Sequence, residues 1–208
     1  MDTQSKHEKE LVIVQILYLY IIPTLLLFYG VIPGEFRVVM LFLVSLLMYG
    51  IIKRSGWTYA DMGLYKGFTK DFIPYFIFTL VGVIALVTIA ELVPKIENRE
   101  VYEWWEDVRF LLLFIPISVL QEIVFRGILM NMLRRAFTNV PFIILLNASL
   151  FALIHIIYLD TDIILPLTFI GGIGFALMYY RYKNLIMISI SHTILNFTAM
   201  ILGFFVIR

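Results

Sequence analysis

Hydrophobic residues fall into seven long runs along this chain, separated by polar residues or by glycine and proline. The runs are Leu11–Ile32, Phe36–Ile52, Phe72–Val93, Val108–Leu133, Pro141–Tyr158, Ile163–Tyr180 and Leu185–Ile207. They lack the period-2 alternation of half-buried strands, and their lengths are close to the roughly 20 residues that a helix needs to cross a bilayer. Only helices and closed barrels satisfy their backbone groups in lipid. The pattern therefore predicts an all-α fold, a polytopic transmembrane helical bundle of about seven helices.

Composition supports a membrane protein and excludes several classes of function. The chain is 62% hydrophobic, above the roughly 45–50% of soluble domains. Its net charge is +1 and no basic block is longer than a pair, so we expect no nucleic acid partner. It contains no cysteine, which excludes a thiol nucleophile, a thiolate metal site and a disulfide framework. Because no linker or repeat is visible, we expect a single transmembrane domain over residues 1–208.

The distribution of lysine and arginine predicts the orientation of the spans. The first run is too long for a signal-peptide core and no small-residue cleavage pattern follows it, so we expect it to remain as a span. If the N-terminus is cytoplasmic, ten of the 16 Lys and Arg residues lie on that side, five lie opposite and Arg126 lies inside the membrane. By the positive-inside rule, this asymmetry predicts a multi-pass cell-membrane protein with a cytoplasmic N-terminus and an extracytoplasmic C-terminus.

Some of the prolines and glycines within the predicted spans bear on helix shape and packing. Pro116 and Pro166 each remove a backbone hydrogen bond, and we expect Pro116 to kink its helix near Glu122. The glycines are Gly171, Gly172 and Gly174. Small residues of this kind let membrane helices approach closely, so we interpret these glycines as a packing surface.

Charged residues stand out in the middle of the fourth run. Glu122 and Arg126 are spaced i, i+4, so they share a helix face and can neutralise each other. A charge near the bilayer centre costs about 2.5–3.5 kcal/mol on insertion scales and usually marks a functional site. Two further one-turn motifs follow in apolar surroundings, Phe151-x-x-x-His155 and His192-x-x-x-Asn196, which hold two of the chain's three histidines.

Each motif alone has an ordinary structural explanation. The charged pair could be a structural ion pair, the histidines could be satisfied core residues, and Asn196 could form a helix–helix hydrogen bond. Together, a carboxylate, two imidazoles and an amide are the parts of a site that activates water for hydrolysis. We therefore expect one internal cavity to be lined by these groups and the paired arginine: Glu122, Arg126, His155, His192 and Asn196. Counted by helix rise, His155 and His192 lie at different depths, so their helices must be tilted, offset or differently bounded.

These three motifs carry a family resemblance. Q-E-I-V-F-R-G, F-A-L-I-H and S-H-T-I-L-N resemble the E-E-x-x-x-R, F-x-x-x-H and H-x-x-x-N patterns of the CAAX-processing and bacteriocin-processing intramembrane proteases, also called the Abi family. The resemblance covers about residues 110–198 and implies a catalytic core at about residues 108–200. It implies an intramembrane endopeptidase acting on a peptide or membrane-anchored protein within the lipid bilayer, and bacterial members are associated with bacteriocin immunity. The implied catalytic residues are Gln121, Glu122, Arg126, His155, His192 and Asn196.

One position departs from the family pattern. The family's first glutamate is taken to activate the attacking water, and here that position is Gln121, whose amide cannot accept a proton. The family's second glutamate, here Glu122, is expected to orient the arginine. Three explanations are open: a natural non-catalytic member, a deliberately inactivated variant, or an enzyme in which Glu122 is the base.

The residues leave the cofactor and the class of function open. Glu122, His155 and His192 could hold zinc, but H-E-x-x-H spacing is absent and we prefer a metal-free site without a cofactor. The alternative function is a pseudoprotease that binds and regulates a membrane peptide or protein. A transporter or channel is disfavoured because neither inverted repeats nor paired broken helices occur in the sequence.

Overall fold

The computed structural model describes residues 3–64, 70–93 and 108–204, and this part of the chain is helical without strands. Its elements are α1 (Thr3–Ile16), η1 (Leu17–Ile21), α2 (Ile22–Phe28), η2 (Gly34–Phe36), α3 (Arg37–Ser55), α4 (Phe72–Leu92), α6 (Val108–Glu122), η3 (Ile123–Leu129), α7 (Met130–Ala136), α8 (Val140–Leu153), η4 (Ile154–Ile157), α9 (Thr161–Tyr182) and α10 (Leu185–Ile201). Several elements are continuous with one another: α1–η1–α2, α6–η3–α7 and α8–η4. The described residues therefore form seven helical bodies, which confirms the predicted all-α bundle.

Six of these bodies are long and apolar enough to cross a membrane, and α10 is shorter, with 17 residues. Most of their bounds differ slightly from the predicted runs, and three ends differ more. The first body begins at Thr3 and not at Leu11 and ends at Phe28 and not at Ile32, and α10 ends at Ile201 and not at Ile207, although residues 205–207 lie outside the described part. Gly30 and Gly203 follow these ends with φ of 69° and 83°, the left-handed conformation that commonly terminates helices.

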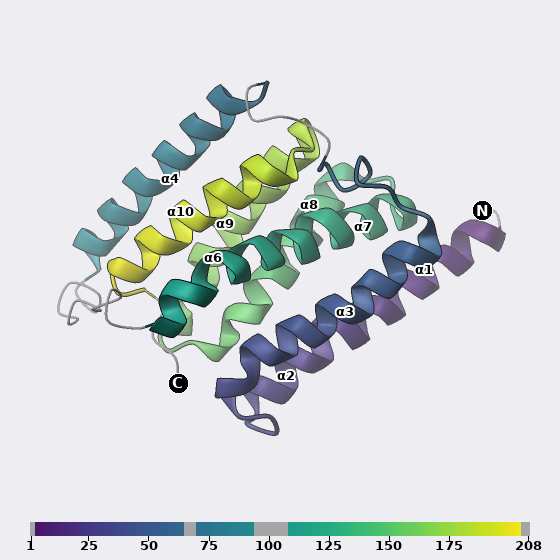
Figure 1. Ribbon diagram of the computed structural model, residues 1–208, viewed down its shortest axis with the longest axis horizontal. Helices are drawn as coiled ribbons and strands as arrows, with labels where there is room; N and C mark the ends of the chain where they lie inside the picture. Colours follow the sequence, from purple (N-terminus) through teal and green to yellow (C-terminus); the bar gives the residue numbers. More distant parts are fainter. Residues whose placement is uncertain (1–2, 65–69, 94–107, 205–208) are drawn as a thin grey trace.

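The helices form two layers, with α4 on the outside. Figure 1 shows α3, α6–α7 and α10 in the nearer layer, α1–α2, α8 and α9 behind them, and α4 outside α10. The closest packing pairs α8 with α9, and α10 lies between α4 and α6. The first helix begins at one end of the bundle and α10 ends at the other (Figure 1). Most buried residues of the main hydrophobic core come from the last four bodies, which also carry the three motifs.

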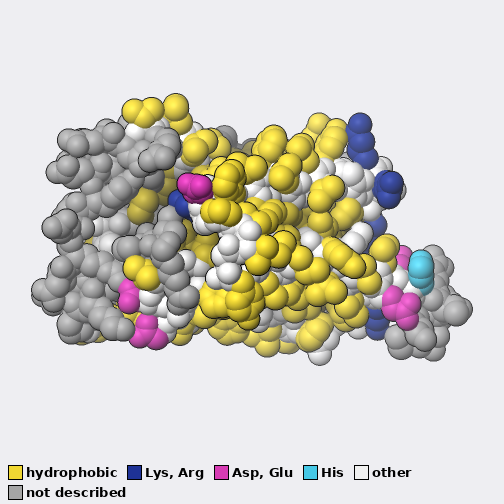
Figure 2. Space-filling model, turned by 90° about the horizontal axis from the view of Figure 1, so that it is seen from below, with side chains coloured by type: hydrophobic (Ala, Val, Ile, Leu, Met, Phe, Trp, Pro, Cys, Tyr) yellow, Lys and Arg dark blue, Asp and Glu magenta, His cyan; other side chains and the backbone are white. Residues whose placement is uncertain are grey.

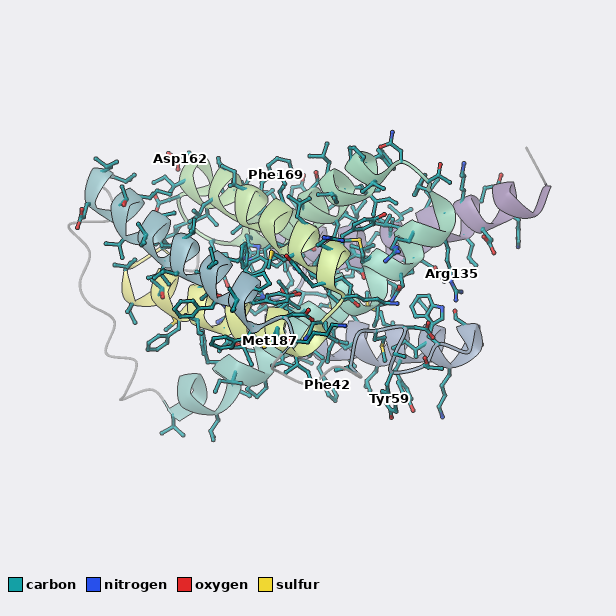
Figure 3. The ribbon with its side chains drawn as sticks, turned by 90° about the horizontal axis from the view of Figure 1, so that it is seen from above. Phe42, Tyr59, Arg135, Asp162, Phe169 and Met187 are labelled. Carbon is teal, nitrogen blue, oxygen red and sulfur yellow. The ribbon has the colours of Figure 1, made fainter. Side chains whose placement is uncertain are left out.

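The outer surface is hydrophobic between the two ends. Figure 2 shows apolar side chains over most of one face, with lysine and arginine gathered at the end where α1 begins. Large apolar side chains such as Leu47 and Phe76 are exposed, which suits helices that face lipid. In Figure 3, Tyr59 and Arg135 lie toward that basic end and Asp162 toward the opposite one.

A short segment at the basic end joins α3 to the core. The backbone N–H and hydroxyl of Thr58 donate hydrogen bonds to Asp61, at 2.7 Å and 2.8 Å, and they hold the pKa of that carboxyl below its ordinary value. Gly63 lies against the α9–α10 connection, where its carbonyl accepts a hydrogen bond from the backbone of Leu185 at 3.0 Å. The segment is therefore tied to the turn from which α10 starts.

The prolines named above do not interrupt their helices, and the three glycines differ in how closely they pack against neighbouring helices. Helix α6 continues through Pro116 and α9 continues through Pro166, while the irregular backbone near the charged pair is the π-helical turn η3. A Cβ added to Gly172 would lie 3.1 Å from Cα of Ala148, and one on Gly174 would lie 2.8 Å from the ring of Phe78. A Cβ on Gly171 would meet nothing within 4 Å. The expected packing surface is therefore made by two of the three glycines.

Candidate active site

The charged pair lies at the junction of α6 and η3. Glu122 is the last residue of α6, and Arg126 lies in the middle of the π-helical turn that follows. Nη1 of Arg126 donates to Oε1 of Glu122 at 3.0 Å, and neither side chain is exposed. Nη2 of Arg126 lies 3.4 Å from the carbonyl oxygen of Gly172 on α9. The pair is thus buried in protein, as the cost of charge in lipid requires.

His192 brings α10 to the same carboxylate. Its Nδ1 lies 2.6 Å from Oε1 of Glu122, the oxygen that also accepts the hydrogen bond from Arg126. With Glu122 ionised, Nδ1 carries the proton and donates it. The other oxygen, Oε2, is buried and has no hydrogen-bond partner among the described residues. Glu122 is therefore a shared acceptor that links the first motif to the third.

His155 lies where α8 tightens into the 3-10 turn η4. Its Nδ1 is 2.8 Å from the carbonyl oxygen of Phe151, one turn earlier. A carbonyl can only accept, so Nδ1 carries the proton and the neutral ring has its lone pair on Nε2. This tautomer is the one in which a histidine can take a proton from water through Nε2.

Aromatic rings bring the motifs together. The ring of Phe151 contacts the imidazole rings of His155 and His192, with centroid distances of 5.0 Å and 5.5 Å. The guanidinium carbon of Arg126 lies 4.4 Å from the same Phe151 centroid and 5.2 Å from that of Phe175. The centroids of the two imidazole rings therefore lie no further apart than the sum of their two distances to the Phe151 centroid. The structure brings Glu122 and these three polar side chains into one buried cluster.

Asn196 forms a second polar contact between α6 and α10. Its Nδ2 lies 3.4 Å from Oγ of Ser118, which donates to the carbonyl of Phe114 at 3.1 Å. Ser118 is one turn before Glu122 on α6, and Asn196 is one turn after His192 on α10. The interface of these antiparallel helices thus carries two polar contacts one turn apart. Asn196 is only half-buried, and within the described part no hydrogen bond joins it directly to Glu122.

Gln121 differs from the other predicted site residues in its hydrogen bonding. It is half-buried, and its Oε1 is buried without a hydrogen-bond partner among the described residues. On an α-helix it lies about 100° around the axis from Glu122. The structure therefore places it next to Glu122 in the chain, with no hydrogen bond from Oε1 to either histidine among the described residues.

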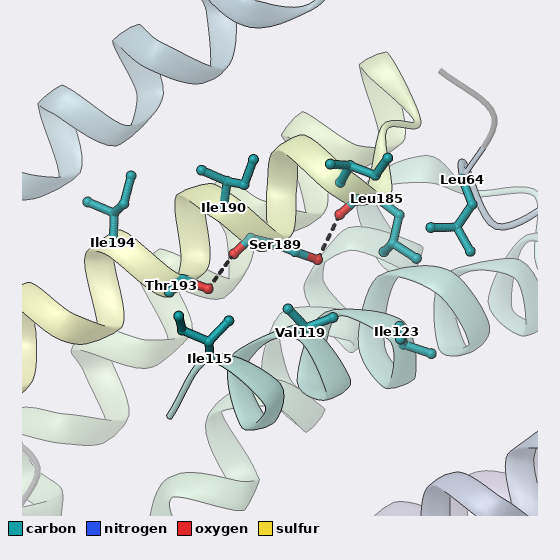
Figure 4. A pocket seen from close by; sticks show the side chains of 10 residues that line it. Leu64, Ile115, Val119, Ile123, Leu185, Ser189, Ile190, Thr193 and Ile194 are labelled. Carbon is teal, nitrogen blue, oxygen red and sulfur yellow. Dashed lines mark hydrogen bonds between the residues drawn. The ribbon is translucent and has the colours of Figure 1, made fainter. Parts of the chain in front are cut away.

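An apolar groove runs beside the cluster. It has a volume of about 400 Å³ and lies between α6 and α10, near Leu64 (Figure 4). Its walls are aliphatic, and the hydroxyls of Ser189 and Thr193 donate to carbonyls of their own helix at 2.7 Å and 2.8 Å. None of the six predicted site residues lines it. The groove can hold an apolar chain but supplies no reactive group.

Glu122, His155 and His192 are possible ligands if zinc is bound, an option that we do not prefer. Among the described residues, no group of three or more His, Cys, Asp or Glu side chains could hold a metal ion. The polar atoms of Glu122 and His192 bond each other, and Nδ1 of His155 bonds a carbonyl. As arranged here, Glu122, His155 and His192 do not fit a zinc site with three protein ligands.

Three contributors to the site were not predicted from the sequence. Ser118 bonds Asn196, the ring of Phe175 packs 5.0 Å from that of His192, and the carbonyl of Gly172 accepts from Arg126. Ser118 could have been found because it lies one turn before Glu122 on the same helix face. Nothing in the sequence distinguishes Phe175 from the other phenylalanines of the spans.

Part of the chain matches the model of a known family. Residues 103–198 match the family described as type II CAAX prenyl endopeptidase Rce1-like. The match covers all three motifs and confirms the resemblance drawn from them. No curated protein and no solved structure matches the chain significantly.

Proposed function

We propose that this chain, whose residues 103–198 carry the pattern of the type II CAAX prenyl endopeptidases, is an intramembrane endopeptidase for a peptide or membrane-anchored protein. The observation that carries the proposal is the buried carboxylate of Glu122, which bonds both Arg126 and His192, while His192 and His155 pack on the same Phe151 ring. A structural ion pair would need no second partner of this kind and no neighbouring imidazole. The arrangement suits a hydrolytic site placed inside the membrane.

His155 is the proton acceptor in the proposed reaction. Its Nδ1–H is held by the Phe151 carbonyl, so Nε2 can take a proton from the attacking water. The water oxygen adds to the peptide carbonyl carbon, and the tetrahedral intermediate then expels the amine. The same Nε2 returns the proton to the departing nitrogen, which balances the reaction. Gln121 can hydrogen-bond the water but cannot share the proton, so turnover is slow.

His192 and Asn196 stabilise the negative oxygen of that intermediate. For Nε2 of His192 to donate while Nδ1 donates to Glu122, the ring must be an imidazolium. The carboxylate of Glu122 then balances the positive charge, and Arg126 donates a hydrogen bond to the same carboxylate oxygen. Asn196, one turn further along α10, offers an amide donor on the same side. In this assignment Glu122 acts as a charge partner and not as the base.

The remaining features of the proposal concern cofactor and membrane placement. We take the site to be metal-free, because hydrogen bonds within the chain already fix both histidines. We place the chain in the cell membrane as one transmembrane domain, with its basic end on the cytoplasmic side. A role in bacteriocin immunity, as in bacterial relatives of the family, is part of this proposal.

A second function is favoured by a specific residue. Gln121 stands where the family has its water-activating glutamate, and replacing such a base by an amide costs about 10²–10⁴-fold in rate. A protein with this site could bind the same membrane partner and regulate it without cleaving it. This pseudoprotease reading needs the cluster only for shape and charge.

Restoring the carboxylate separates the two functions. We expect Gln121→Glu to gain peptidase activity on a membrane-anchored peptide in liposomes, and Gln121→Glu with His155→Ala to lose it again. If the unmodified protein cleaves and Gln121→Glu is inert, Glu122 is the base and the roles above are wrong. If neither form cleaves any peptide while both bind the same partner equally, the pseudoprotease reading replaces the enzyme.

A further inference from the structure

The backbone that carries Arg126 is not an ordinary α-helix. Residues Ile123–Leu129 form the π-helical turn η3, and the N–H of Met130 after it bonds the carbonyl of Phe125, five residues earlier. Such turns are rare within helices and are often found at functional sites. A π-helical turn is less favourable than the α-helix around it, so contacts outside the turn must stabilise it.

Two buried polar side chains from other helices supply such contacts. The hydroxyl of Tyr20 donates to the carbonyl of Val124 at 2.9 Å, and Nδ2 of Asn147 donates to the carbonyl of Phe125 at 2.8 Å. These are the two carbonyls directly before Arg126. Tyr20 is 2% exposed and Asn147 is fully buried. With no water in the hydrocarbon region, polar atoms at this depth need partners within the protein.

Tyr20 is itself held in an unusual backbone. It lies in the π-helical turn η1 of the first helical body, where the hydroxyl of Thr24 donates to its carbonyl at 2.7 Å. Its ring packs edge-on against that of Phe125, with centroids 5.3 Å apart. Tyr20 lies well outside residues 103–198, the part that matches the endopeptidase family. The first helix therefore contributes a specific contact to the candidate active site.

We infer that Tyr20 and Asn147 are positioning residues, whose hydrogen bonds to the carbonyls of Val124 and Phe125 hold the turn that aims Arg126 at Glu122. A π-helical turn contains one residue more than an α turn. Its relaxation to α geometry would rotate the residues after it by about 100° relative to Glu122. The position of Arg126 then changes, and through Glu122 so does the hydrogen bond to His192.

Kinetics provide the first test, which rests on the proposed function. In the Gln121→Glu protein, Tyr20→Phe removes one hydroxyl but keeps the ring against Phe125. We expect kcat to fall about 10–100-fold with KM nearly unchanged, because small misplacements of reacting groups cost this much. Asn147→Leu should act in the same direction. The matched controls are Tyr18→Phe, an exposed tyrosine of the same turn, and Ser149→Ala, an exposed serine of the same helix.

A spectroscopic test does not depend on activity. The chain has three histidines, so ¹⁵N-labelled imidazoles give few signals. Tyr20→Phe in the unmodified protein should shift the His192 signals, because a displaced Arg126 changes the hydrogen bonding of Glu122, the partner of His192. Tyr18→Phe should leave these signals in place. Unchanged His192 signals with unchanged kcat would overturn the inference. Shifted signals in a protein whose Gln121→Glu form never cleaves would instead overturn the proposed function and leave the positioning role standing.

Discussion

Nδ1 of His192 lies 2.6 Å from Oε1 of Glu122, although 70 positions separate the two residues in the chain. The same oxygen accepts from Arg126 at 3.0 Å. One carboxylate oxygen thus links the side chains of His192 and Arg126. The first and third motifs therefore form one electrostatic unit, and substitutions within it should not be additive.

Arg126→Leu should strongly destabilise the protein. The substitution leaves a buried carboxylate with His192 as its remaining donor, and breaking a buried pair costs about 3–5 kcal/mol. Expression and the thermal unfolding temperature in detergent should both fall. Arg134→Leu, which removes an exposed arginine from the same helical body, should have little effect.

The double substitution tests whether this loss comes from the unpaired charge. Glu122→Gln with Arg126→Leu removes both charges and should recover much of the stability lost by Arg126→Leu alone. Equal unfolding temperatures for the single and double variants would show that the pair is not coupled. Glu122 would then be available for another role, including that of base.

Gly172→Ala should destabilise the protein, and Gly171→Ala should not. A methyl group on Gly172 would lie 3.1 Å from Cα of Ala148, so α8 and α9 must separate slightly. Overpacking of this kind typically costs about 1–3 kcal/mol. The added methyl of Gly171→Ala meets nothing within 4 Å, and alanine favours a helix over glycine by about 1 kcal/mol. An unfolding temperature below that of the parent for Gly172→Ala and above it for Gly171→Ala would support this packing.

Gly63→Ala should be more damaging than Gly56→Ala, although both glycines have positive φ. The φ values are 73° and 64°, so both substitutions carry a similar backbone penalty of about 1–2 kcal/mol. A Cβ on Gly63 would also lie 2.5 Å from the carbonyl oxygen of Lys183, whereas one on Gly56 would meet nothing within 4 Å. The extra loss of thermal stability in Gly63→Ala measures the contact with the α9–α10 connection. Equal losses would show that this contact is dispensable.

The helices could be predicted from hydropathy because lipid imposes a simple length and composition on each span. The run Phe72–Val93, for example, became α4 with an end one residue earlier. The pairing of Glu122 with Arg126 also followed from spacing, since i, i+4 residues meet on any helix. Both predictions rest on local features, span length and i, i+4 spacing, that the sequence itself encodes.

The relative depths of the two histidines could not be predicted. Helix rise placed His155 and His192 far apart, yet both imidazoles pack on the ring of Phe151. Their relative heights depend on how far α8 and α10 are offset or tilted against each other, which no local pattern encodes. The π-helical turn at Ile123–Leu129 was also missed, because its stabilising partners Tyr20 and Asn147 come from other helices.

Stability and activity should change in opposite directions in Gln121→Glu. The new carboxylate lies about 100° around the helix from Glu122, and Oε1 of Gln121 is already buried without a partner in the described part of the chain. A second negative group there is repelled by Glu122 and poorly solvated, so we expect a loss of about 1–3 kcal/mol in unfolding free energy. Peptidase activity should rise at the same time, because a carboxylate is restored at the position that holds the water-activating glutamate in the resembled family. Gln121→Leu is the matched control: it removes the unsatisfied amide without adding charge, so it should be at least as stable as the parent and inactive. If Gln121→Glu unfolds at the same temperature as Gln121→Leu, the new carboxylate does not share the cluster with Glu122, and position 121 cannot supply the base.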